Sequence, residues 1–259
     1  MTKRSSVIGV ICALFGAASL IGGCAQTAGT SALTWSPEPY MDFALGPRLP
    51  GPGVDGINSA LAAIDGQAQS RRVDCLAAAG DLGSWIRTVW TPYVGPRFLT
   101  VAISDQMNCG GAHPGGEIAY YTFDRTIDDV PDWATLWPGV RVGVANPGAG
   151  GLAARTGSPA LWTWYADAVR RDASIDPELK RHCSDRLGPA PEGEDLAIWL
   201  DGASGGLGLK LTDLPHAAKA CGFVQIMPAD EMARLGASDE LLREVRAAPA
   251  TFDYSEMPR

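Results

Sequence analysis

Four cysteines constrain the fold of this chain most strongly, because two of them lie in each half of the sequence. They are Cys75, Cys109, Cys183 and Cys221. Four cysteines allow three pairings, and the sequence alone leaves all three open. We favour Cys75 with Cys109 and Cys183 with Cys221, since each of these bonds joins segments of one half of the chain. Each would close a loop of roughly 35 residues, worth about 3–4 kcal/mol in the chain-entropy account of disulfides.

The first residues have the pattern of a bacterial export signal. Lys3 and Arg4 supply positive charge, and an apolar stretch of 15 residues follows at 7–21. That stretch is shorter than the roughly 20 residues with which a helix spans a bilayer. It leads into Gly22-Gly23-Cys24, and residues 20–24 resemble the lipobox of bacterial lipoproteins. The alternative is an ordinary signal peptide with an incidental cysteine.

The lipobox resemblance implies a signal peptide at 1–23 and a lipid on the sulfur of Cys24. Two or more acyl chains, such as palmitate, anchor a protein stably, so we predict a membrane-bound protein that faces the periplasm. Ala25, rather than an aspartate, follows Cys24, which favours the outer membrane over the inner one. Cys12 leaves with the signal peptide. The remaining even number of cysteines suits an oxidising compartment.

The chain is acidic. It carries 21 Lys and Arg against 29 Asp and Glu, a net charge of −8, and loss of Lys3 and Arg4 brings the mature chain near −10 (19 − 29). No basic run occurs, so a nucleic-acid partner is not expected. Long-range attraction would favour a cationic partner, although an acidic surface also serves simply to keep a protein soluble.

The first half of the chain predicts a tether, a helix and several strands. Five prolines within 37–52 predict a Pro-rich tether over 24–54. Asp55 is predicted to cap a helix that carries apolar residues at helical spacing. Strands follow at 85–90, 98–104 and 118–123, and glycines between the last two predict an antiparallel pair. A short helical segment at 133–137 and a short strand at 140–144 come next. The predicted apolar positions of the helix are Ile57, Leu61, Ile64 and Ala68.

The second half begins after a glycine-rich loop at 146–157. Ser158 is predicted to cap a helix with Pro159 at its first position. Further elements are a helical segment at 177–187, strands at 196–200, 207–211 and 223–227, and helices at 230–235 and 239–247. No βαβ rhythm repeats. We therefore predict an α+β fold over 55–250, with a mostly antiparallel sheet and helices packed on one face. The predicted apolar stripe of the first helix is Leu161, Trp164, Tyr165, Ala168 and Val169.

One motif is compatible with hydrolytic chemistry. Residues 202–206 match the G-x-S-x-G pattern, with Ser204 as nucleophile. In that motif the serine joins a strand to a helix, whereas here a predicted strand follows, so a hairpin turn explains the same residues. The only histidines that could act as the base are His113, His182 and His216. We predict no catalytic residue, and an envelope serine hydrolase using Ser204 is the alternative function.

Cysteine and histidine lie near each other at three places in the sequence, as zinc ligands often do. The chain has no C-x-x-C pair, however, and an oxidising compartment would convert its thiols to disulfides. We therefore predict neither a metal nor a cofactor. The loop 146–151 is glycine-rich, but no Gly-Lys-Ser/Thr follows it as in a phosphate-binding loop.

The most distinctive local sequence is the loop at 109–116, which leads into an aromatic strand. One interpretation is a tight turn, whose glycines take positive φ and whose Cys109 fixes the strand end. The other is an exposed recognition loop, in which His113 and either Tyr120 or Tyr121 contact a partner.

The chain is similar to the RsiV-type extracytoplasmic domain of unknown function. That domain occurs in a lysozyme-sensing anti-sigma factor and beside the catalytic domain of some peptidoglycan deacetylases. The similarity extends over about residues 55–246. Its matching residues are Gly110-Gly111-Ala112-His113-Pro114, Thr122-Phe123-Asp124 and 133–136 in the first half, and 205–209, 213–217 and 224–228 in the second.

The resemblance implies an α+β module that binds proteins or cell-wall material without known catalytic residues. The anti-sigma role and the deacetylase activity do not carry over, because the segments responsible for them are not expected in this chain. We therefore predict a non-catalytic envelope lipoprotein that binds a protein or peptidoglycan ligand. Lysozyme is a candidate partner because it is cationic and this chain is acidic.

Overall fold

The computed structural model describes residues 43–140, 142–144, 153–188, 196–212 and 214–247. The predicted signal peptide and Cys24 lie outside these residues, as do most of the predicted tether and much of the loop at 146–157. Among the described residues, no helix is both long enough and apolar enough to span a bilayer.

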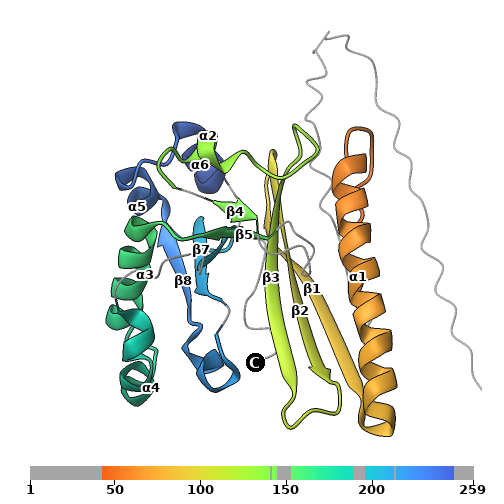
Figure 1. Cartoon of the computed structure of the whole chain (residues 1–259). Coiled ribbons are helices and arrows are strands. Elements are labelled where there is room, and N and C mark those ends of the chain that lie inside the picture. Colours follow the sequence, from red (N-terminus) through yellow and green to blue (C-terminus); the bar gives the residue numbers. More distant parts are fainter. Residues whose placement is uncertain (1–42, 141, 145–152, 189–195, 213, 248–259) are drawn as a thin grey trace, which may run out of the picture. The chain divides into compact units, whose positions relative to one another are not determined.

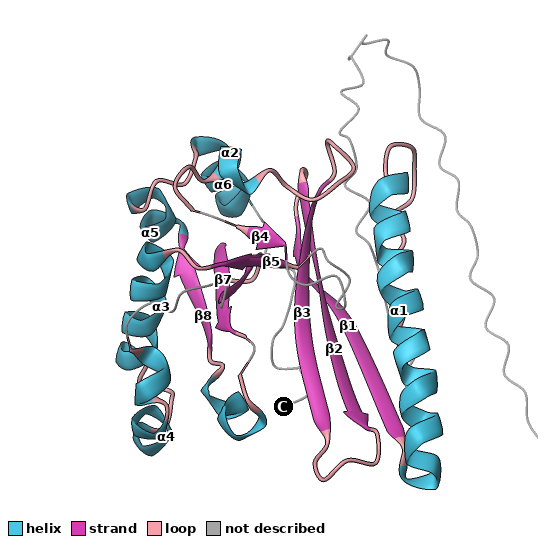
Figure 2. Cartoon of the chain, viewed as in Figure 1, coloured by secondary structure: helices cyan, strands magenta, loops and turns pink. Residues whose placement is uncertain are grey.

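The described chain has the predicted α+β fold (Figures 1 and 2). Its elements, with η for 3-10 helices, are α1 (Asp55–Ala79), η1 (Gly80–Leu82), β1 (Ser84–Val94), β2 (Phe98–Asn108), β3 (Gly115–Asp124), α2 (Trp133–Leu136), β4 (Gly143–Val144), β5 (Ala154–Thr156), α3 (Pro159–Arg171), α4 (Pro177–His182), η3 (Ser184–Leu187), β6 (Leu196–Asp201), β7 (Gly206–Leu211), η4 (His216–Cys221), β8 (Val224–Pro228), α5 (Ala229–Arg234) and α6 (Asp239–Ala247). The strands form two antiparallel sheets, in the orders β1-β2-β3 and β4-β5-β6-β7-β8. The predicted antiparallel pairing is confirmed, and the strands divide between two sheets.

The first sheet consists of long strands with α1 on one face (Figure 1). β2 pairs with β3 from Phe98↔Asp124 to Met107↔Gly115, so the predicted hairpin is present and longer than expected. The helix buries Ile57, Leu61, Ile64 and Ala68, as its spacing predicts. Because these side chains lie three or four residues apart, they form one stripe along α1.

Helices α3, α5 and α6 contact β7 and β8 of the second sheet, on the side away from the first sheet (Figure 1). Leu161, Tyr165 and Val169 of α3 are buried as predicted, but Trp164 and Ala168 are only half-buried. Trp162 is buried instead, and its indole Nε1 donates to the carbonyl of Gly188. The stripe is thus wider than predicted, because α3 packs on the sheet along one side and on the η3 segment along another.

The free faces of the two sheets pack against each other. Trp90, Ala102 and Tyr120 of the first sheet form one apolar cluster with Ala197 and Trp199 of the second. Both sheets are therefore covered on both faces, by helices on one side and by each other on the second. The packing of the two sheets on each other buries these aromatic side chains.

The end of the predicted tether belongs to the domain. The backbone N–H of Gly46 donates to the Asp65 carboxylate of α1 at 3.1 Å. The backbone N–H of Leu49 donates to the side-chain oxygen of Asn58, and the side-chain amide of Asn58 donates to the backbone carbonyl of Leu49. The side chain of Leu49 is buried. The tether prediction is therefore wrong for residues 43–54. Their hydrogen bonds to Asn58 and Asp65 hold this segment beside α1.

The predicted helix caps are only partly right. Val54, not Asp55, is the N-cap residue of α1, and the side chain of Val54 makes no capping hydrogen bond. The Asp128 carboxylate instead accepts the N–H groups of Gly56 and Ile57, at 2.6 and 2.9 Å. Ser158 is the N-cap residue of α3, as predicted, but its hydroxyl makes no capping hydrogen bond.

Candidate functional site

The residues predicted to bind a partner do not form one surface. His113 is exposed in the turn between β2 and β3, whereas Tyr120 and Tyr121 are only 2% and 3% exposed. Successive side chains of a strand point to opposite faces. Tyr120 accordingly packs on Trp199 between the sheets, while Tyr121 lies on the face that carries α1. Neither tyrosine is therefore part of an exposed recognition loop.

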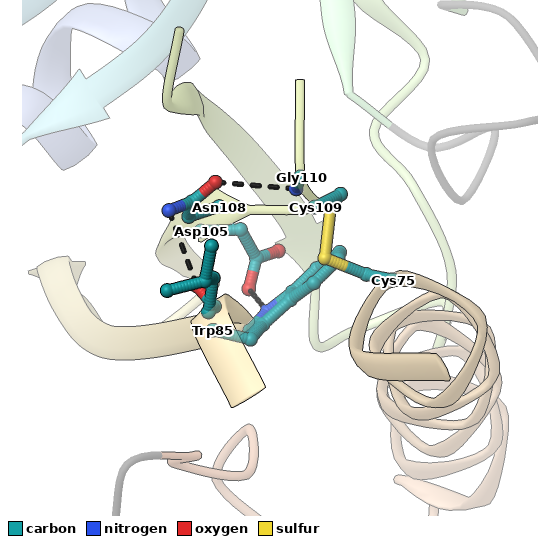
Figure 3. Close-up of a disulfide and its surroundings, with 7 residues drawn as sticks. Cys75, Trp85, Asp105, Asn108, Cys109 and Gly110 are labelled. Carbon is teal, nitrogen blue, oxygen red and sulfur yellow. Dashed lines mark hydrogen bonds between the residues drawn. A yellow bond between two sulfur atoms is a disulfide. The ribbon is translucent and has the colours of Figure 1, made fainter. Parts of the chain in front are cut away.

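Disulfides connect Cys75 with Cys109 and Cys183 with Cys221, the two pairs favoured from the sequence. The first joins the last turns of α1 to the residue that follows β2 (Figure 3). Beside it, the Asn108 side chain accepts the N–H of Gly110, whose φ of 81° suits the turn interpretation of this loop. Paired cysteines indicate an extracytoplasmic domain.

Ser204 lies exposed in the turn between β6 and β7. Its backbone N–H donates to Asp201 at 2.9 Å, and Asp201 lies opposite Gly206 in the antiparallel register. The serine thus joins two strands of a hairpin, not a strand and a helix as in the hydrolase motif. Within the described part of the chain, no group of three or more His, Cys, Asp or Glu side chains is arranged to hold a metal.

A pocket of about 460 Å³ lies beside β3, and we call it the β3 pocket. Its lining comes from α1, β1, β2 and β3 on one side and from β5, β7 and η4 on the other. β3 is the edge strand of the first sheet, so its free edge leaves room for a pocket next to the second sheet. The volume falls in the range of small-molecule sites, roughly 300–1,000 Å³.

The described lining of the β3 pocket is rich in cations, although the chain as a whole is acidic. Among the lining residues that the structure describes, the acidic ones are Asp105 and Glu117. The cationic lining residues are Arg71, Arg87, Arg155, Lys210 and Lys219. The pocket therefore differs in charge from the molecule that contains it.

The cations of the first-sheet side have acidic partners. Arg87 is buried and donates to Asp105 at 2.7 Å and to Asp65 at 3.2 Å. The indole of Trp85 donates to the same Asp105 at 2.9 Å (Figure 3). Arg71 pairs with Glu117 at 2.6 Å. These ion pairs leave little net charge on this wall of the pocket.

The lysines of the second-sheet side have a different environment. Lys210 lies in β7, and Lys219 in η4 donates to the backbone carbonyl of Gly116 at 2.8 Å. Among the described carboxylates, none forms an ion pair with either lysine. Burial and the nearby charge of Lys219 hold the pKa of Lys210 below its usual value.

The strand register explains how Lys210 reaches the pocket. Arg155 of β5 and Lys210 of β7 both lie opposite Ala197 of β6, so all three side chains share one face of the second sheet. Ala197 is part of the cluster between the sheets, so this face is the one that meets the first sheet. This site was not predicted from the sequence. Its one local signal is an isolated lysine, Lys210, that alternates with buried leucines.

Comparison with known proteins gives only distant likenesses. No family profile matches the sequence, and no curated protein matches it. Solved structures that resemble it include a DUF3298 family protein from Pseudomonas aeruginosa PAO1, with a TM-score of 0.41 and 14% identity over 67% of this chain and 70% of that one. A DUF3298 family member from Bacteroides fragilis NCTC 9343 gives 0.41 and 13%, over 74% and 69%. DUF3298 is the RsiV-type domain. At this similarity, neither structure transfers a residue role or a function to this chain.

Proposed function

We propose that this chain is a non-catalytic, lipid-anchored binding protein of the bacterial envelope, and that its ligand binds in the β3 pocket. The observation that carries the proposal is the lining of that pocket. Apolar side chains such as Ile64, Ile103 and Leu211 line it together with converging cations. Apolar walls with a few placed polar groups are typical of ligand sites.

The envelope location has two supports. The two disulfides suit an oxidising compartment, and the residues around Cys24 resemble a lipobox. Cells fed an alkyne analogue of palmitate should label the wild-type chain and leave Cys24→Ala unlabelled. An unlabelled wild type, or a Cys24→Ala chain that keeps the label, would contradict the lipid anchor.

The charge of the pocket favours a cell-wall ligand. Peptidoglycan fragments carry carboxylates on their peptides, and carboxylates are attracted by the lysines of this pocket. A cationic protein such as lysozyme would be repelled there. It is the second candidate ligand, favoured by the net charge of −8 rather than by the pocket.

A pull-down at low salt tests both ligands with the full chain. We expect the chain to be retained on isolated peptidoglycan, with retention reduced by competing soluble fragments. If the chain is retained on immobilised lysozyme and not on peptidoglycan, its ligand binds outside the β3 pocket. Retention on neither material would overturn the proposed function.

A further inference from the structure

We propose that Lys210 and Lys219 form an anion subsite on the second-sheet wall of the β3 pocket, which binds a carboxylate of a small ligand. The inference rests on the proposed function, because it concerns the same pocket. It adds the chemical class of the ligand and the two side chains that recognise it.

The distribution of ion pairs in the pocket points to an anion. On the first-sheet wall, Arg87 has Asp65 and Asp105 as partners, and Arg71 has Glu117. Lys210 is half-buried, and no described carboxylate pairs with it. Burial and the charge of Lys219, which has the same sign, act together to lower the pKa of Lys210. A cation that loses hydration without gaining a counter-charge is destabilising. Among the described residues no carboxylate offsets this cost, and a bound anion would do so; groups perturbed by burial and by neighbouring charge concentrate at functional sites.

The two lysines are held by rigid parts of the fold. Lys210 belongs to β7, which pairs with β6 on one side and with β8 on the other. Lys219 lies in η4, whose last residue, Cys221, is tied by a disulfide to Cys183. Donors that are fixed before the ligand arrives lose less entropy on binding.

Gly222 allows η4 to approach β7 closely. A Cβ at this position would lie 3.1 Å from the carbonyl oxygen of Leu211 and 3.3 Å from Cε of Lys210. A side chain there would displace the Lys210 ammonium or push η4 away. The glycine therefore permits the juxtaposition of the two lysines that the subsite needs.

The rest of the pocket limits the ligand. The volume of about 460 Å³ suits a small molecule, or one short branch of a polymer such as a peptidoglycan peptide. Ile118, Leu211 and Leu214 line the pocket beside the lysines, so an apolar portion of the ligand can contact them. The shared chemistry is thus a carboxylate on a small body that is partly apolar. A muramyl peptide from the cell wall and a free organic acid both offer it.

Isothermal titration calorimetry of the full chain in detergent tests the subsite. The probes are muramyl dipeptide, citrate and inorganic phosphate. We expect saturable binding of the two carboxylate ligands, and about tenfold weaker binding in Lys210→Met and in Lys219→Met, as expected for loss of one charge-assisted hydrogen bond. Arg243→Met is the control, because it removes the same charge from an exposed position of α6. Denaturant unfolding of each variant identifies any that fail to fold.

The outcomes separate the subsite from the proposed function. If both lysine variants bind muramyl dipeptide with the same affinity as the wild type, the subsite is overturned and the cell-wall function still stands. Citrate binding that the lysine variants lose supports the subsite, and it does so even if the chain is not retained on peptidoglycan. Binding of phosphate alone would overturn the carboxylate class. Absence of binding by all three probes at low salt would overturn the subsite.

Discussion

Tyr120 of β3 and Trp199 of β6 stack face to face, with ring centroids 3.6 Å apart and ring planes within 5°. This contact joins the two sheets. It depends on Gly208, which lies opposite Trp199 in the β6–β7 register. A Cβ at Gly208 would lie 2.0 Å from Cε2 of the indole, so the ring can lie flat only over a glycine.

Replacing Gly208 should therefore destabilise the domain. We expect Gly208→Ala to lower the free energy of unfolding by about 1–3 kcal/mol, the usual range for overpacking a core. Gly66→Ala is the matched control. Gly66 is exposed in α1 with no atom near its missing Cβ, so the change should stabilise the helix by about 0.5–1 kcal/mol. Urea unfolding measures both. Equal effects of the two changes would contradict this account of the stack.

Asp128 should stabilise α1 across a gap of more than 70 residues in sequence. Its carboxylate caps the helix, and its own φ of 56° lies in the left-handed region. We expect Asp128→Gly, which keeps the backbone conformation accessible, to cost about 1 kcal/mol for the lost cap. Asp128→Ala should cost about 1 kcal/mol more, because alanine adopts positive φ poorly. Equal stability of the two variants in chemical unfolding would show that backbone strain contributes nothing at this turn.

Arg87 should contribute far more to stability than Arg48, although both pair with Asp65. Arg87 is fully enclosed, and Arg87→Met would leave Asp65 and Asp105 buried without their shared partner. We expect a loss of about 3–5 kcal/mol. The Arg48 side chain is 42% exposed, so Arg48→Met should cost under about 1 kcal/mol. Denaturant midpoints of the two variants give the comparison, and a small effect of Arg87→Met would refute the buried network.

Asp201 should make stability fall as pH rises. The residue is fully buried, Oδ1 accepts the N–H of Ser204, and no described group donates to Oδ2. Burial raises the pKa of this carboxyl above its ordinary value of 3.8. The folded state then binds the proton more tightly than the unfolded state, so stability declines from about pH 3.8 up to the raised pKa.

Asp201→Asn keeps an acceptor for Ser204 and removes the buried charge. We expect this variant to be more stable than the wild type at neutral pH, and to lack the decline in stability over that window. Unfolding free energies measured across acidic pH test the sign directly. Parallel pH profiles for the two proteins would mean that Asp201 is not the titrating group.

Local periodicity predicted much of the fold. The stripe at Ile57, Leu61 and Ile64 predicted α1, and the glycines between two alternating segments predicted the β2–β3 hairpin. These signals depend only on neighbours in the chain. The three-residue strand β5 fell inside a predicted glycine-rich loop, because its pairing with β6 comes from a distant segment. Prolines predicted a tether over residues that Asp65 in fact holds against α1.

The candidate site could not be predicted for the same reason. Lys210 alternates with Leu209 and Leu211, and such alternation normally places the polar residue in solvent. Here the face of β7 that carries Lys210 is covered by the first sheet, and no local pattern indicates that the two sheets pack together. The tyrosine pair was misleading because both rings complete cores on the two faces of β3.

The free energy of unfolding of the wild type and of Lys210→Met, each measured with and without citrate, tests the anion-binding pocket most directly. Without citrate at neutral pH, the variant should be the more stable protein, because it lacks a half-buried ammonium beside Lys219. Saturating citrate, about a hundred times its Kd, should stabilise the wild type by about 2.7 kcal/mol and the variant much less. A variant that is less stable without citrate, and that gains as much from citrate as the wild type, would show that Lys210 has a structural role and recognises no anion.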